Sequence, residues 1–224
     1  MGWRHCDGCT VALVLTLSVL ASSTPVLADM VSSEGVEPWH ICGGCHRLDG
    51  AGNHIKFPRL GGQRPAYIMK QLDDFRTGRR ENDGGQMQEM AGELADKDIP
   101  RVADWFAKQA PPWPKATMKQ DQPDRATPDR VRLMVTKGAG GIPACLGCHS
   151  AAAPNLAGRE AVAPRIAGQW DYFIAKQLAD FRDGRRDNDP GGVMRAVARD
   201  LTDADIAGLA AYLSRHPELH EAAP

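Results

Sequence analysis

The 224-residue chain has a formal net charge of −1, and 42% of its residues are hydrophobic while 25% are charged. These values are typical of a soluble globular protein and exclude a disordered chain or one built of membrane spans. The near-zero charge gives no basis for a nucleic-acid partner. Aromatic residues are only 6% of the chain, so its core must be filled in another way, of which a large bound cofactor is one.

Residues 1–28 have the pattern of an export signal. Arg4 and His5 form a short positive segment, residues 11–20 are apolar, and residues 26–28 (VLA) suit a cleavage site. The apolar run is too short to span comfortably the roughly 30 Å of a bilayer core. We therefore predict cleavage after Ala28 and a periplasmic protein. An uncleaved leader, which would hold the protein loosely at the membrane, is the alternative.

Two Cys-x-x-Cys-His motifs follow, CGGCH at 42–46 and CLGCH at 145–149. A further pair, Cys6 and Cys9, lies in the leader and precedes Thr10 rather than His, so we interpret it as incidental. The motif is typical of haem c, in which two thiols form thioether bonds to the porphyrin and the adjacent His binds the iron. We predict two haem c groups. The expected attachment residues are Cys42, Cys45, Cys145 and Cys148, and the expected iron ligands are His46 and His149.

Other uses of a Cys-x-x-Cys pair fit the sequence less well. A thioredoxin-like redox pair needs a βαβ context, and no stretch here alternates like a strand. A zinc site needs two pairs close in space, whereas these two pairs belong to separate repeats. Because every cysteine beyond the leader lies in a haem motif, we also predict no disulfide.

The chain beyond the leader is a duplicated module. Residues 58–83 and 164–189 are identical at 16 of 26 positions, and residues 87–99 match residues 194–206. A repeat of this length indicates two copies of one domain.

The predicted domains are residues 29–109 and 130–224. Between them, residues 110–129 carry five prolines and no apolar periodicity. Proline at this density favours an extended, semi-rigid linker.

Each module is predicted to be all-α. Over residues 65–78, Ile68, Leu72 and Phe75 recur at i, i+4 and i+7, on one face of a helix. Pro65 suits the first turn, and Gly78 suits the position just past the end. The second copy repeats this pattern with Ile174, Leu178, Phe181 and Gly184.

A second helix is predicted near the end of each module. Its apolar residues are Ile99, Val102, Ala103 and Phe106 in the first copy, and Ile206, Leu209, Ala210 and Leu213 in the second. Thr202 followed by Asp205 predicts a capping box at the start of the second copy's helix.

The sixth iron ligand is predicted from the methionines. Met87 and Met194 align with each other after a Gly-Gly pair, whose flexibility would let a loop cross the haem face. Met90 is the fallback in the first module, and bis-His ligation there is a further alternative. Met134 lies in an apolar helix and is expected in the core. The remaining histidines are expected at the surface: His40, His54, His216 and His220.

The complete pattern resembles the tandem dihaem class I cytochromes of the cytochrome c4 type. The second half carries GIPACLGCH, PRIAGQ, YFIAKQLADFRDGRR and MxxVAxxLTDADIAGLAAYL, and the first half carries CGGCHRLDGAG, FPRLGGQ, YIMKQLDDFRTGRR and MQEMAGEL. The resemblance covers essentially all of the chain beyond the leader. It implies two tandem class I cytochrome c domains, each a small helical fold around one covalently bound haem.

The resemblance also implies roles for residues around the haems. The carbonyl groups of Pro58 and Pro164 would accept hydrogen bonds from the iron-binding histidines, which orients each ring and raises its basicity. Two duplicated arginine pairs stand in the FRxGRR segments. They would either pair with haem propionates or form a solvated basic face: Arg79 and Arg80, and Arg185 and Arg186.

The implied function is electron transfer in the periplasm rather than catalysis. With His and Met on the iron, no coordination position is left for a substrate. The expected donor is a quinol-oxidising complex or a periplasmic dehydrogenase, and the expected acceptor is a terminal oxidase or reductase of a respiratory chain. Two alternatives belong to other classes: a haem subunit of a larger periplasmic dehydrogenase, and a dihaem peroxidase, which needs an open iron.

Overall fold

The computed structural model describes residues 35–53, 56–110, 128–151 and 163–221. Across these ranges the secondary structure is helical, and the only β-type pairing is an isolated bridge between Ala139 and Ile142. The all-α prediction is confirmed. The predicted leader and nearly all of the predicted linker lie outside the described residues. None of the helices in the described ranges is long and apolar enough to cross a membrane.

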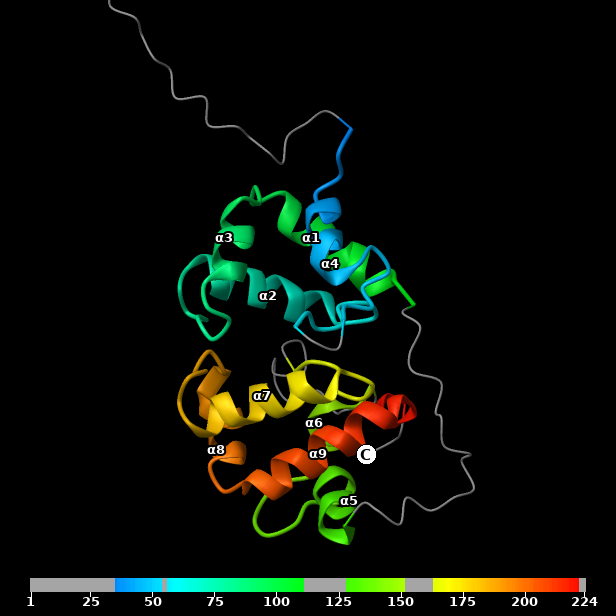
Figure 1. Ribbon diagram of the computed structural model, residues 1–224, viewed down its shortest axis with the longest axis vertical. Coiled ribbons are helices and arrows are strands. Elements are labelled where there is room, and N and C mark those ends of the chain that lie inside the picture. Colours follow the sequence, from blue (N-terminus) through cyan, green and yellow to red (C-terminus); the bar gives the residue numbers. More distant parts are fainter. Residues whose placement is uncertain (1–34, 54–55, 111–127, 152–162, 222–224) are drawn as a thin grey trace, which may run out of the picture. The chain divides into compact units, whose positions relative to one another are not determined.

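The two modules repeat one arrangement of helices (Figure 1). The first module contains α1 (Trp39–His46), α2 (Pro65–Arg76), α3 (Gln86–Gly92) and α4 (Asp98–Lys108). The second contains α5 (Asp129–Thr136), α6 (Leu146–His149), α7 (Asp171–Arg182), η1 (Pro190–Gly192), α8 (Val193–Ala198), α9 (Asp203–Arg215) and η2 (Pro217–His220). Helix α2 packs against α3 and α4, as α7 packs against α8 and α9, and α5 adds a contact with α9.

Helix α2 forms where the apolar period predicted it. Pro65 occupies the first turn, where its missing N–H removes no helical hydrogen bond. Ile68, Leu72 and Phe75 are buried on one face. The helix ends at Arg76, and Gly78 follows with φ 71°, a left-handed value that other residues rarely adopt. The prediction for this segment is confirmed.

Helix α7 repeats this design over Asp171–Arg182. Ile174 and Phe181 are buried, Leu178 is partly buried against the same core, and Gly184 has φ 73°. In α4 and α9 the predicted apolar faces also pack inward, and Met134 of α5 is completely buried.

The predicted capping box at the start of α9 is present. The hydroxyl of Thr202 accepts a hydrogen bond from the Asp205 amide, and the Asp205 carboxylate accepts one from the Thr202 amide. Arg130 of α5 donates to the same carboxylate at 2.8 Å. This hydrogen bond is the main reason that the pKa of Asp205 falls to about 2. The ionised carboxylate therefore joins α5 to the first turn of α9.

Amide side chains link the two modules reciprocally. Gln63 of the first module accepts from the Arg165 amide at 2.8 Å and donates to the Arg165 carbonyl at 3.0 Å. Gln169 of the second module does the same with Arg59, at 2.9 and 3.0 Å. Each glutamine thus pairs with one residue of the other module as a neighbouring strand would. Because Gln63 and Gln169 align in the duplication, one sequence feature produces both contacts.

A second reciprocal pair of contacts joins each of α2 and α7 to the loop that follows the other helix. Asn188 donates to Gln71 at 3.0 Å and to Asp74 at 2.6 Å. Asn82 donates to Gln177 at 3.0 Å and to Asp180 at 2.7 Å. The four acceptors are buried although they are polar. Burial of such groups is tolerated because each one is hydrogen-bonded.

Both buried carboxylates in these contacts remain ionised. Desolvation opposes the charge on Asp74, but hydrogen bonds from Lys70, Asn188 and Arg79 outweigh it and keep its pKa below the usual range. Asp180 is held in the same way by Lys176, Asn82 and Arg185, and its pKa is also lowered. Both acids therefore accept hydrogen bonds across the module contact at neutral pH.

We predict that Gln169→Ala exposes one specific amide. Without the glutamine, the buried N–H of Arg59 loses its acceptor, at a cost of about 1–3 kcal/mol. Hydrogen exchange measured residue by residue should become faster at Arg59 and stay slow at Arg165, which bonds Gln63 instead. The mirror variant Gln63→Ala should reverse the pattern. Equal protection of both amides in both variants would contradict the reciprocal contact.

Candidate haem-binding site

A cavity of about 630 Å³ collects the residues that the sequence singled out. This volume lies within the usual range for a cofactor site. The lining is mostly apolar and comes from both modules. It includes all eight predicted attachment and iron-binding residues: Cys42, Cys45, His46, Met87, Cys145, Cys148, His149 and Met194. Pro58 and Pro164 line it as well.

Local helix geometry brings each Cys-x-x-Cys-His motif to the cavity. In α1, Cys42 and His46 are four residues apart, and Cys42 and Cys45 are three apart, so all three side chains share one helix face. In the second module the short α6 contains Cys148 and His149, and Cys145 is its N-terminal capping residue. Each motif therefore presents two thiols and an imidazole in one direction.

Both motif histidines are buried and oriented by a proline carbonyl. His46 Nδ1 lies 2.9 Å from the Pro58 oxygen, and His149 Nδ1 lies 2.7 Å from the Pro164 oxygen. A carbonyl oxygen only accepts, so Nδ1 carries the proton and Nε2 keeps a free lone pair. Burial lowers the pKa of each histidine. The neutral ring is the form that binds a metal.

Close backbone packing in the first module brings Pro58 to His46. The Gly52 amide donates to the His46 carbonyl at 2.8 Å. A Cβ at Gly52 would lie 2.3 Å from the Phe57 oxygen and 2.6 Å from the Pro58 oxygen, and its φ of 62° is left-handed. Only glycine therefore permits this approach.

The first thiol of each motif lies in surroundings that favour its neutral form. Burial raises the pKa of Cys42 and of Cys145 to about 11. Redox exchange and metal binding both need the thiolate, which buried apolar surroundings disfavour. Among the described residues, no three His, Cys, Asp or Glu side chains gather where they could hold a metal ion. The environment therefore suits attachment to a porphyrin better than a zinc or thioredoxin-like site.

The two aligned methionines occupy equivalent positions at the start of α3 and α8. Met87 follows Gly84 and Gly85, whose φ values are 79° and 87°. Asp83 accepts a hydrogen bond from the Met87 amide at 2.6 Å, which stabilises this helix start. Met194 follows a second left-handed Gly-Gly pair in the same way. Both methionines are partly buried against the core of their own module.

Met90, the fallback ligand, also lines the cavity, but it is 36% exposed and aligns with Val197. Among the other histidines, His40 is exposed, His216 is half-buried, and His54 lies outside the described residues. The surface prediction is wrong for His220, which is buried on η2, where its carbonyl accepts from the Ala151 amide at 2.7 Å. The second module ends in this extra turn, which the repeat did not predict.

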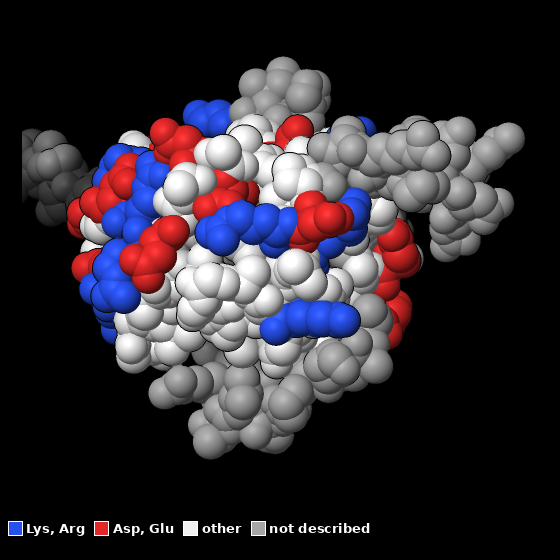
Figure 2. Space-filling view, turned by 90° about the horizontal axis from the view of Figure 1, so that it is seen from below, with Lys and Arg blue, Asp and Glu red and all other residues white. Residues whose placement is uncertain are grey.

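The interpretation of the duplicated arginines as a solvated face is wrong for Arg80 and Arg186. Both are buried, because they lie where α2 and α7 meet the loops of the other module. Arg79 and Arg185 are more than half exposed and form ion pairs with aspartates. On the face shown in Figure 2, basic and acidic side chains are interspersed rather than separated by sign. The pair between Arg79 and Asp73, in which both side chains are exposed, contributes little to stability, whereas Arg185 pairs with the buried Asp180.

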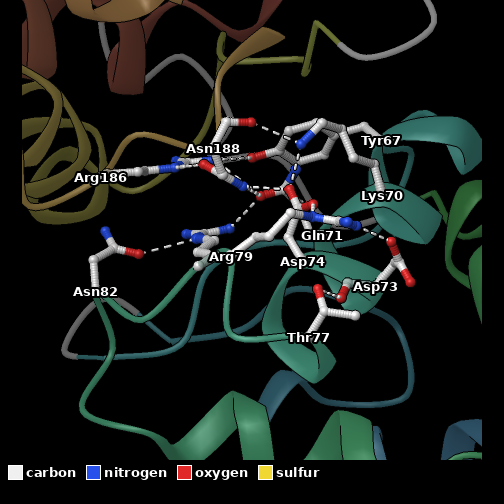
Figure 3. Close-up of polar contacts among 11 residues, drawn as sticks. Tyr67, Lys70, Gln71, Asp73, Asp74, Thr77, Arg79, Asn82, Arg186 and Asn188 are labelled. Carbon is white, nitrogen blue, oxygen red and sulfur yellow. Dashed lines mark hydrogen bonds and ion pairs between the residues drawn. The ribbon is translucent and has the colours of Figure 1, made fainter.

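The buried guanidinium groups bond to neutral oxygens. Arg80 donates to Gln71 at 2.7 Å and to Gln177 at 3.1 Å. Arg186 donates to the same two glutamines, at 3.0 Å to Gln71 and at 2.8 Å to Gln177. Figure 3 shows the contact with Gln71. Neither makes an ion pair within the part of the chain that the structure describes. Burial, and then the like charge of Arg186, lowers the pKa of Arg80 to about 9.

These observations test whether the cavity fits haem c. Two buried cations line an apolar cavity without carboxylate partners among the described residues, which is costly unless an anion joins them. The buried hydroxyl of Tyr172, also on the lining, has no hydrogen-bond partner in the described ranges. A porphyrin with acidic side chains and an apolar ring would supply anions for the two cations and a hydrogen-bond acceptor for the hydroxyl. The residues present therefore fit the group.

The signal for the buried arginines was present in the sequence. Helix periodicity explains the apolar identities between the copies, but it does not explain why the polar residues Gln71, Arg80 and Asn82 recur as Gln177, Arg186 and Asn188. Polar identity between repeats indicates a shared contact, and here each of these residues bonds across the module boundary.

Comparison with known proteins gives the family. No family model matches the chain. It is 35% identical to a cytochrome c4 of Azotobacter vinelandii over 212 residues, covering 91% of this chain and 96% of that protein. It is 35% identical over 177 residues to a thiosulfate dehydrogenase electron acceptor of Stutzerimonas stutzeri, covering 77% of each. The crystal structure of reduced cytochrome c4 from Pseudomonas stutzeri superposes with a TM-score of 0.63 at 33% identity, covering 80% of this chain and 94% of that one.

The likeness extends over both modules and includes both Cys-x-x-Cys-His motifs. It shows two class I cytochrome c domains that carry two haem c groups and serve as an electron carrier rather than an enzyme. On this evidence the chain belongs to the cytochrome c4 family.

Proposed function

We propose that this protein is a periplasmic electron shuttle, which accepts electrons from a respiratory or dehydrogenase donor and delivers them to a terminal oxidase or reductase. The observation that carries the proposal is the presence, in each module, of a buried neutral imidazole and a partly buried thioether on one cavity. When bound, each haem supplies a one-electron change between Fe(III) and Fe(II). The family relationship favours this role over a dihaem peroxidase.

The residues of each module have distinct tasks. Cys42 and Cys45, and Cys145 and Cys148, attach the two porphyrins. His46 and His149 bind iron through Nε2, because their Nδ1–H groups are engaged by Pro58 and Pro164. Met87 and Met194 complete the coordination. A Met ligand favours Fe(II) and raises the potential, and a filled sixth position keeps substrates from the iron.

The apolar lining would keep water away from the bound haems, and the buried Arg80 and Arg186 would supply positive charge at the same cavity. We assign these two arginines to the haem propionates. A cation near the iron disfavours Fe(III) relative to Fe(II), so it raises the potential. We further propose that residues 1–28 are removed on export, and that residues 110–129 only connect the modules.

Replacing each methionine tests the ligand assignment. Mature protein from a host that assembles cytochromes c should hold two haems per chain and show the ferric far-red absorption band of Met–iron ligation. Met87→Ala and Met194→Ala should each lose part of that band. Met90→Ala is the matched control and should keep it. An intact band in Met87→Ala would instead indicate Met90 or a histidine as the ligand in the first module.

Replacing a buried arginine tests the propionate assignment. Arg80→Gln should lower the potential of at least one haem in a spectroelectrochemical titration, because a buried positive charge is removed. Arg79→Gln removes an exposed charge from the adjacent position and should change the potential much less, since solvent screens it. Unchanged potentials in Arg80→Gln would remove the assignment.

A dehydrogenase subunit is the second candidate function. It is favoured by similarity to the thiosulfate dehydrogenase electron acceptors of Stutzerimonas stutzeri and Thiomonas intermedia. Native purification distinguishes the two. A free shuttle should elute alone at a mass near 24.2 kDa less its leader, whereas a subunit should elute with a catalytic partner that reduces it.

A further inference from the structure

The contacts around the two buried arginines, Arg80 and Arg186, are reciprocal except at one position. Gln71, Arg80 and Asn82 each have an aligned counterpart that makes the mirrored contact. Tyr67 does not, because its aligned residue is Phe173. Arg186 of the second module donates to the Tyr67 hydroxyl at 3.3 Å, as Figure 3 shows. Arg80 finds no such hydroxyl, because a phenylalanine stands at the mirrored position.

The bond from Arg186 determines what the Tyr67 hydroxyl can do. The phenol oxygen accepts from a cation, which leaves its own O–H as a donor. Within the described ranges no residue accepts that hydrogen, and Tyr67 lines the haem cavity. Desolvation opposes ionisation of the phenol, but the positive charges of Arg186 and Arg80 outweigh it, so its pKa is lowered. A phenol so placed is a stronger hydrogen-bond donor than an unperturbed one.

Tyr172 does not reproduce this arrangement in the second module. It stands one position earlier along α7 and aligns with Ala66. Its hydroxyl is buried at the cavity but bonds no arginine among the described residues. Burial raises the pKa of Tyr172 to about 12, in the opposite direction to that of Tyr67. The two cavity phenols therefore differ in their electrostatic surroundings.

We propose that Tyr67, anchored by Arg186 of the other module, is a positioning residue that makes the two haem sites unequal, by raising the potential of the first-module haem relative to the second. The inference rests on the proposed function. Its physical basis is that a hydroxyl that donates into the cavity would disfavour Fe(III) more than Fe(II). In an otherwise duplicated contact, this one hydroxyl gives electron transfer between the modules a preferred direction.

The test is a redox titration of the holoprotein in which each haem is followed by its own NMR signals. Tyr67→Phe should shift the electron distribution toward the second-module haem at least threefold, which is about 28 mV at 59 mV per tenfold for one electron. Phe173→Tyr offers Arg80 the missing hydroxyl and should shift the distribution the same way, by raising the second-module potential. Unfolding midpoints of both variants check that the modules stay packed.

Three outcomes would overturn the inference. Tyr67→Phe could leave the distribution unchanged, it could shift both potentials equally, or Tyr172→Phe could shift the distribution as far in the same direction. In each case two Met-ligated haems would still be observed, so the proposed function would stand. Loss of a haem or of the Met–iron band from the wild-type protein would instead contradict the proposed function itself.

Discussion

The site depends on keeping each buried motif imidazole neutral and fixed in one orientation. A histidine that binds iron through Nε2 carries its proton on Nδ1, and that N–H needs an acceptor away from water. The Pro58 and Pro164 carbonyls provide it. In the first module this requires the loop around Pro58 to lie against the His46 backbone, which only a glycine at position 52 allows. The helical frame then has to hold that loop, and α2 and α4 do so through a compact apolar core.

The module contact shows how a duplicated sequence solves a second problem, the burial of charge. Lys70 with Asp74, and Lys176 with Asp180, form ion pairs within α2 and α7. The asparagines of the opposite module complete the hydrogen bonding of both carboxylates. Arg80 and Arg186 are different, because glutamine and tyrosine oxygens orient them without neutralising them. Their charge is thus available to the cavity, where acidic groups of a cofactor can use it.

Small departures from the duplication then distinguish the modules chemically. Tyr67 aligns with Phe173, and Arg64 aligns with Trp170. The side chains of Arg64 and Trp170 both contact the other module, but their partners differ. Arg64 donates to the Ser150 carbonyl at 2.7 Å, while the Trp170 indole donates to the Ala51 carbonyl at 3.2 Å. Trp170 also stacks under Arg59 at 3.8 Å. An electron carrier with two similar sites needs such differences if one site is to be filled before the other.

The sequence by itself determined the helices, the duplication and the haem chemistry. Each of these rests on local spacing: Ile68, Leu72 and Phe75 mark a helix face, and Cys42, Cys45 and His46 mark a haem motif, wherever the segment lies in space. Only the tertiary structure decided the fate of Arg80, Arg186 and His220. The sequence predicted exposure for His220, and for the two arginines it left haem-propionate pairing and a solvated basic face as alternatives. Their burial depends on partners about 100 residues away in the chain or on a terminal turn without a counterpart in the first copy. The polar identities between the copies indicate that Arg80 and Arg186 make a shared contact, but no pattern within one copy gives their burial, because the free energy of burying a polar group depends on the partners that the complete fold brings to it.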